Sequence, residues 1–267
     1  MTADRTGQPS EASSEGSRGD GSRGDERSSE ARTWREGHWD ATYANRGVEG
    51  VSWYQARPLV SLEFFDSLQV PTTSSIIDVG GGASSVVGHL AERGFGDLTV
   101  IDISGEALAA ARERAPGDAV ITWVRHDILC WNPPRTFGVW HDRAVFHFLT
   151  RPEDRERYRN VLRASLRPGG IAIVATFAPD GPESCSGLPV ARYDAEELAA
   201  VLGDARPVRT TRVPGEGSTL RGPAGDALVP VASRREVHVT PSGARQPFTW
   251  VAFRRAPGTG DDSPATS

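Results

Sequence analysis

The sequence predicts a doubly wound α/β fold, in which a mostly parallel sheet of seven strands ends in an antiparallel hairpin. Short apolar runs alternate five times with helical patterns, which is typical of parallel strands joined by crossover helices. The last two strand patterns, residues 235–239 and 248–253, alternate apolar with polar side chains. They flank the turn Pro241-Ser242-Gly243, as expected for a hairpin at the edge of the sheet.

The two ends of the 267-residue chain differ in composition from the segment between them. Residues 1–33 are mostly Ser, Gly, Arg, Asp and Glu, and residues 256–267 are mostly Pro, Gly, Asp, Ser and Thr. Neither stretch has the apolar side chains that offset the entropy of ordering a chain, so we expect both to be disordered tails. Residues 34–255 then form one domain, which is long enough to bury a core.

In the first half of this domain, cap residues and glycines indicate where helices and turns begin and end. Pro58 opens a helix with Leu59, Leu62 and Phe65 at helical spacing, and Ser84 is the N-cap residue of a later helix. In order, we expect a helix from residue 57, a strand at 75–79, a glycine turn at 80–82, a helix at 84–93, a strand at 98–101 and a helix at 104–115.

The second half continues the alternation. The run 171–177 is almost entirely apolar, as expected for a strand that is buried on both faces. A helix that starts at Asp194 has Glu197 three residues later, the pattern of a capping box. We expect strands at 120–124, 137–140 and 171–177, helices at 153–166 and 194–202, and an irregular excursion over 212–232, which is rich in Pro and Gly.

Composition excludes several classes of function. All thirty basic residues are Arg, so the chain has no lysine for a phosphate-binding loop, a pyridoxal-phosphate Schiff base or a protein-kinase site. The net charge of −5 offers no basic field for nucleic acid. Two cysteines exclude a disulfide framework, and no apolar run is long enough to span a membrane. We therefore expect a cytoplasmic protein without nucleic-acid or membrane partners.

Acidic residues follow successive strands of the predicted sheet. Asp78 precedes the turn Gly80-Gly81-Gly82, and Asp102, Asp127 and Asp142 each come at or after the end of a later strand. Ligands of doubly wound sheets bind at this carboxyl edge. Each Asp alone could be a helix cap, but four in succession beside three glycines predict a ligand site.

The charges favour a cationic ligand over a pyrophosphate. The pattern Gly-x-Gly-x-x-Gly is incomplete, because Ser85 stands at the third glycine position, and Asp78 would repel phosphates. S-adenosylmethionine carries a sulfonium, an ammonium and a ribose diol. Asp102 is placed to accept from both ribose hydroxyls, and Asp127 to accept from the adenine amino group. Ile103 and Ile128 would flank the adenine ring.

At these motifs the chain resembles the class I S-adenosylmethionine-dependent methyltransferases, whose fold is Rossmann-like. Asp-Val-Gly-Gly-Gly-Ala-Ser at 78–84 is similar to the glycine loop of that family, and Asp-Ile-Ser at 102–104 to its ribose-binding segment. His-Asp-Ile at 126–128 is similar to the adenine-side motif, and Leu-Arg-Pro-Gly-Gly at 166–170 to the turn before the fifth strand. The resemblance implies that S-adenosylmethionine is the methyl donor, with Asp78, Gly80, Gly81, Gly82, Asp102, Ile103, Asp127, Ile128 and Asp142 among the binding residues.

Two finer resemblances point to different acceptors. The segments Trp-His-Asp-Arg-Ala-Val-Phe-His-Phe-Leu at 140–149 and Cys-Ser-Gly-Leu-Pro-Val at 185–190 are similar to a bacterial subgroup of small methyltransferases. The segment His-Trp-Asp at 38–40 is similar to the entry segment of a lysine-methylating branch, in which the fourth motif is usually acid-Lys-Gly. Asp-Arg-Ala at 142–144 departs from that motif.

Candidate catalytic residues are His141 and Asp142, which should lie nearest the point of methyl transfer. His141 is either a general base or a structural histidine. Trp39 and Trp53, with their aromatic neighbours, either cover the sulfonium by cation–π contact or pack the N-terminal segment. The histidine spacing indicates no metal site.

The sequence is therefore interpreted as a methyltransferase that acts on a small-molecule acceptor. A protein substrate is the first alternative, as in a protein-lysine methyltransferase. A regulator that binds S-adenosylmethionine without chemistry is the second, and a nicotinamide oxidoreductase, disfavoured by Asp78, is the third.

Overall fold

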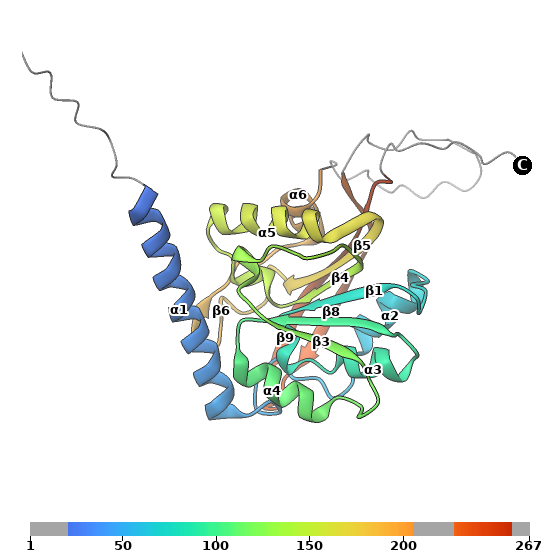
Figure 1. Cartoon of the computed structure of the whole chain (residues 1–267), viewed down its shortest axis with the longest axis horizontal. Coiled ribbons are helices and arrows are strands. Elements are labelled where there is room, and N and C mark those ends of the chain that lie inside the picture. Colours follow the sequence, from blue (N-terminus) through green and yellow to red (C-terminus); the bar gives the residue numbers. More distant parts are fainter. Residues whose placement is uncertain (1–20, 205–226, 258–267) are drawn as a thin grey trace, which may run out of the picture.

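The computed structural model, which describes residues 21–204 and 227–257, contains a seven-stranded sheet in the order β3-β2-β1-β4-β5-β9-β8 (Figure 1). The pairs among the first five strands are parallel, and β9 runs antiparallel to both β5 and β8. The predicted fold class is confirmed, including the antiparallel hairpin. The strands are β1 (Ser75–Val79), β2 (Asp97–Asp102), β3 (Ile121–Arg125), β4 (Phe137–Arg143), β5 (Leu166–Phe177), β8 (Leu228–Val239) and β9 (Arg245–Arg255), with a separate two-stranded pair β6 (Ser184–Cys185) and β7 (Leu188–Pro189).

Helices cover both faces of the sheet and create two apolar cores. On one face, side chains of α5 and α6 pack with Trp140, Val174 and Phe253 of the sheet. On the other face, α2, α3 and α4 pack against Ile76, Val100 and Trp250. The helices are α1 (Gly21–Arg46), α2 (Leu59–Ser67), α3 (Val86–Glu92), α4 (Gly105–Arg114), α5 (Pro152–Ser165) and α6 (Ala195–Leu202), together with short 3₁₀ turns η1 (Gly81–Ala83), η2 (Ile128–Cys130) and η3 (Phe146–Phe148).

Side-chain caps start several of these helices. The Ser104 hydroxyl, which was not predicted as a cap, accepts from the amide of Ala107 at the start of α4. Asp194 and Glu197 form the predicted capping box of α6. Ser84 accepts from the amide of Val86, so α3 begins two residues later than expected.

Several predicted boundaries are wrong. The helix α1 begins at Gly21, so residues 21–33 are helical rather than part of a disordered tail; residues 1–20 and 258–267 lie outside the described residues. Within α1, an ion pair joins Arg32 and Glu36, one helical turn apart. The strand β8 begins at Leu228, inside the segment expected to be irregular, because it pairs with β9 along its whole length.

The most consequential shift is that β4 extends through Arg143, three residues beyond its predicted end. Pairing on both sides sustains the extension, since Asp142 is in register with Val79 of β1 and with Val174 of β5. His141 and Asp142 are thus strand residues with side chains on opposite faces of the sheet.

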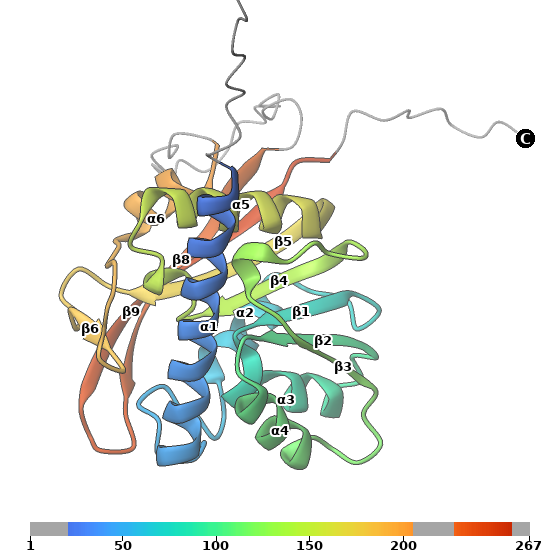
Figure 2. The same ribbon diagram turned by 60° about the vertical axis from the view of Figure 1, so that its left-hand side comes forward.

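The helix α1 crosses in front of the carboxyl ends of the parallel strands (Figure 2). In the described part of the chain, no helix is both long enough and apolar enough to cross a membrane.

Candidate functional site

A pocket of about 840 Å³, measured with its open mouth, lies between α1 and the carboxyl ends of β1 to β4. Its walls come from five regions: α1, the segment that follows α1, the strand ends, the turn after β4 and the β6–β7 pair. The lining residues are Arg35, Trp39, Tyr43, Trp53, Val79, Gly80, Ile101, Asp102, Ile103, His126, Asp127, Ile128, Leu129, Arg143, Ala144, Val145, Phe148, Leu149 and Cys185.

Seven of the predicted cofactor-binding residues line this pocket: Trp39, Trp53, Gly80, Asp102, Ile103, Asp127 and Ile128. The others lie elsewhere. Asp78 borders a smaller adjoining cavity of about 390 Å³. Gly81, Gly82 and Asp142 are buried and do not line either cavity.

Asp102 is fixed at the end of β2 by two backbone amides. Its Oδ2 accepts from Gly82 at 3.0 Å and its Oδ1 from Ser104 at 2.8 Å. Burial raises the pKa of Asp102 to about 6, and these amide donors limit the rise. Each carboxylate oxygen keeps further acceptor capacity, so the group can receive hydroxyl donors from a ligand.

The glycine loop permits this arrangement. Gly80 has a left-handed conformation with φ of +64°, which favours glycine. A Cβ at Gly82 would lie 2.8 Å from Asp102 Oδ2, which is too close for an unbonded carbon. The predicted loop therefore brings its backbone against the Asp102 carboxylate, where a larger residue would not fit.

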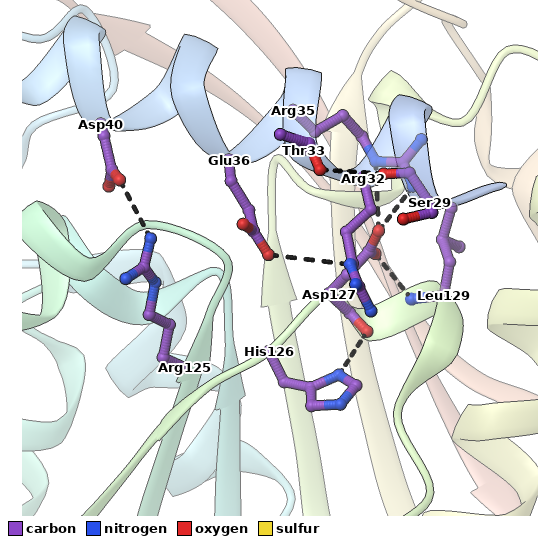
Figure 3. Close-up of polar contacts among 10 residues, drawn as sticks. All are labelled: Ser29, Arg32, Thr33, Arg35, Glu36, Asp40, Arg125, His126, Asp127 and Leu129. Carbon is purple, nitrogen blue, oxygen red and sulfur yellow. Dashed lines mark hydrogen bonds and ion pairs between the residues drawn. The ribbon is translucent and has the colours of Figure 1, made fainter. Parts of the chain in front are cut away.

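Asp127, after β3, accepts from two directions. Its Oδ1 accepts from the amide of Leu129 at 2.9 Å. Its Oδ2 accepts from the guanidinium of Arg35 on α1, with Nη2 at 2.5 Å (Figure 3). The carboxylate predicted to accept from adenine is thus paired with Arg35 in this structure. Arg35 was not among the predicted site residues, because 92 residues separate it from Asp127.

A second polar contact holds α1 near the end of β2. Asp40 accepts from the Ser104 hydroxyl at 2.7 Å and pairs with Arg125 at 3.1 Å, and Figure 3 shows the latter pair. These contacts bring the aromatic residues of α1 over the pocket. The ring of Trp53 lies edge-on to those of Trp39 and Tyr43, with centroids 5.8 and 5.9 Å apart.

His141 does not reach the mouth of the larger pocket, contrary to expectation. It is 1% exposed, and its ring lies between Phe65 and Trp250. Its Nδ1 is 2.7 Å from Asp78 Oδ1 and its Nε2 is 3.0 Å from Ser61 Oγ. Both ring nitrogens are therefore engaged inside the protein, and His141 borders only the smaller cavity.

Asp142 is also wrongly predicted to face the ligand. It is 0% exposed and points to the α5 side of the sheet. It accepts from the Tyr158 hydroxyl at 2.5 Å and from the amides of Val145 and Phe146 at 2.8 and 3.1 Å. Burial raises the pKa of Asp142 to about 6. Its contacts shape the turn that carries the pocket residues Ala144 and Val145.

Arg143 is the residue of β4 that does reach the pocket, although it was not among the predicted site residues. It borders both the larger and the smaller cavity, beside Trp53. Ala144 follows with a φ of +74°, a strained value for a residue with a Cβ. The sequence feature that could have pointed to Arg143 is the departure of Asp-Arg-Ala at 142–144 from the acid-Lys-Gly motif.

Among the residues that the structure describes, no group of three or more His, Cys, Asp or Glu side chains is arranged to hold a metal ion.

Comparisons with known proteins agree with this fold. Residues 76–170 match a family model described as a methyltransferase domain. Thiocyanate methyltransferase 1 of Brassica oleracea is 28% identical over 148 residues, which are 54% of this chain and 63% of that protein. EEF1A lysine methyltransferase 2 of Danio rerio is 29% identical over 146 residues, 51% of this chain and 62% of that protein. The chain thus spans less than two thirds of the length of these curated relatives.

Solved structures show the same fold at low sequence identity. The 1,6-didemethyltoxoflavin-N1-methyltransferase of Burkholderia thailandensis has a TM-score of 0.56 at 17% identity, covering 87% of this chain and 90% of its own. A SAM-dependent methyltransferase of Anabaena variabilis has a TM-score of 0.58 at 16% identity, covering 84% of this chain and 95% of its own.

Proposed function

We propose that this protein is a methyltransferase that uses S-adenosylmethionine as its methyl donor. The observation that carries the proposal is the position of Asp102, a buried carboxylate at the end of β2 that lines the pocket beside a glycine loop. A ribose diol can donate two hydrogen bonds to such a carboxylate. The match of residues 76–170 to a methyltransferase domain supports the same activity.

The residues around Asp102 fit the remaining parts of the donor. Ile103 and Ile128 offer apolar contact for adenine, and Asp127 offers an acceptor for its amino group once Arg35 shares or leaves that carboxylate. Asp78 has one carboxylate oxygen without a partner in the described structure, which suits an ammonium group. The aromatic residues Trp39 and Trp53 suit the sulfonium, which supplies the methyl group.

In this reaction the protein acts mainly by positioning. Transfer from a sulfonium needs the nucleophile, the methyl carbon and the sulfur in line, in a site from which water is excluded. Helix α1 and the segment after it cover the pocket and supply that enclosure. Because His141 and Asp142 are buried with internal partners, we assign them to support of the walls rather than to proton transfer.

A small-molecule acceptor is the proposed substrate class. The segments at 140–149 and 185–190 resemble those of small bacterial methyltransferases, and both segments contribute to the pocket wall. One curated relative is named for thiocyanate, a small molecule. Another is named for lysine in a protein, so a protein substrate is the second candidate.

Donor binding and turnover test this proposal separately. Titration calorimetry should show that S-adenosylmethionine and its demethylated product bind, whereas NAD does not. Transfer of a labelled methyl group in a cell lysate should place label in small molecules, while label in protein bands would favour the lysine alternative. Binding without any demethylated product would indicate a regulator, and preference for NAD would contradict the proposal.

A further inference from the structure

The two ends of the pocket differ in charge. In the strand order β3-β2-β1-β4, Asp102 and the ion pair of Asp127 with Arg35 lie on one side of Gly80, and Arg143 lies on the other. If the acids hold the nucleoside part of a donor, Arg143 lies where the acceptor must enter. This placement makes the surroundings of Arg143 informative about the acceptor.

Only some of the hydrogen-bond donors of the Arg143 guanidinium have partners in the described part of the chain. Its Nη1 donates to the carbonyl of Trp53 at 3.0 Å, and its guanidinium carbon is 4.5 Å from the centroid of the Phe248 ring. Its Nε and Nη2 are buried without a hydrogen-bond partner in the described part of the chain. Within the same residues no carboxylate lies close enough to form an ion pair with it. Burial lowers the pKa of Arg143, in keeping with a cation that is short of partners.

Two acids lie near Arg143, and neither forms an ion pair with it among the described residues. Glu236 of β8 accepts from Gln55 at 2.9 Å and from the indole of Trp250 at 2.8 Å, and its charge opposes the fall in the pKa of Arg143. Asp78, which shares the smaller cavity with Arg143, is bound to His141 through one carboxylate oxygen.

Two titratable groups that interact with Arg143, His147 and Cys185, are poor bases for a neutral acceptor. The ring of a third, His238, lies 2.8 Å from the carbonyl of Ser52, and burial lowers its pKa. His147 is fully buried with both ring nitrogens unpartnered among the described residues. Burial, with a further contribution from Arg143, lowers the pKa of His147 to about 3, so it is uncharged at neutral pH and a weak base. Burial raises the pKa of the Cys185 thiol, which lines the pocket beside Arg143.

We propose that the acceptor is a small anionic nucleophile whose charge is recognised by Arg143. In the reaction, an electron pair of the anion forms a bond to the methyl carbon, and the bond between that carbon and sulfur breaks with its electrons left on sulfur. The anion and the sulfonium both become neutral, and no proton moves. This inference rests on the proposed methyltransferase function and narrows its substrate class.

The test compares wild type with Arg143→Gln, Arg143→Lys and the control Arg254→Gln. The control removes an exposed guanidinium of β9 that donates to the carbonyl of Gly169 at 3.2 Å. Acceptors would be thiocyanate, iodide, benzenethiolate and benzoate, with benzylamine as the cationic comparison. We expect turnover with at least one anion and none with benzylamine. Arg143→Gln should lower kcat/KM by about 10- to 100-fold, with partial recovery in Arg143→Lys.

Binding measurements separate this inference from the proposed function. Thiocyanate should bind to the wild-type complex with demethylated donor and bind at least 10-fold more weakly to Arg143→Gln, while donor affinity stays within about 3-fold in all variants. Retained donor binding with turnover of benzylamine alone, or with no thiocyanate binding, would overturn the anionic acceptor. Loss of donor binding in the wild type would overturn the methyltransferase proposal and this inference with it.

Discussion

The carboxyl ends of β2 and β3 differ from that of β4, although each strand end carries an acidic residue. Asp102 and Asp127 line the pocket, whereas Asp142 faces the core beneath α5 and binds Tyr158. The position at the end of β4 that meets the pocket belongs instead to a cation, Arg143. An acidic residue near a strand end therefore contacts the ligand only if the strand ends at or before it. Its side chain then points into the pocket rather than into a face of the sheet.

The largest effect expected from this comparison is on stability. Replacing Asp142 by Ala leaves three buried donors, from Tyr158, Val145 and Phe146, without an acceptor. We expect a loss of about 3–5 kcal/mol in the free energy of unfolding, which corresponds to a fall in Tm of roughly 10 °C. Differential scanning calorimetry would measure it, with the exposed Asp118→Ala as control. A Tm equal to that of wild type would show that Asp142 does not support the fold.

At the end of β2 we expect the main effect on binding. Asp102→Ala should weaken donor affinity by roughly 1.5–3 kcal/mol, about 10- to 150-fold, because a charged acceptor is lost. Asp102→Asn, which retains one acceptor oxygen, should fall between this variant and wild type. Titration calorimetry with demethylated donor checks both variants. Unchanged affinity in Asp102→Ala would show that the carboxylate does not bind the donor.

The pH dependence of donor binding also tests whether the Asp102 carboxylate binds the donor. Burial raises the pKa of Asp102 to about 6 in the free protein, so the carboxylate is ionised at pH 7 and largely protonated at pH 5. A protonated carboxyl is a poorer acceptor, and we expect donor affinity to fall by up to about 10-fold from pH 7 to pH 5. Calorimetry at pH 5, 6 and 7 measures the change, and Asp102→Asn should flatten it. An equal slope in that variant would assign the dependence to another group.

The smallest effect is expected at His141. A general base would make His141→Gln lose turnover by about 10²–10⁴-fold and would remove a limb of the pH–rate profile. Because both ring nitrogens are bound to Asp78 and Ser61 inside the protein, we expect less than a 10-fold loss and an unaltered profile. The profile, measured from pH 5 to 9, decides between the two roles. Disappearance of a limb of the profile in this variant would restore His141 as a base.

Much of the fold follows from local patterns in the sequence. The alternation of apolar runs with capped helices predicts the sheet and its hairpin, because the period of side-chain burial and the chemistry of caps depend on neighbouring residues. The glycine loop and Asp102 are predictable for the same reason. Gly80, Gly82 and Asp102 lie in one strand–turn–helix–strand unit, whose geometry leaves little choice of where the loop meets the carboxylate.

The tertiary structure alone decided which residues of β4 and α1 meet the pocket. Pairing with β1 and β5 carries β4 through Arg143, and this extension turns His141 and Asp142 to opposite faces of the sheet and brings Arg143 to the ligand. Docking of α1 brings Arg35 to Asp127 across 92 residues. Strand length and helix docking depend on pairing and ion pairs between distant segments, which the pattern of neighbouring residues does not encode.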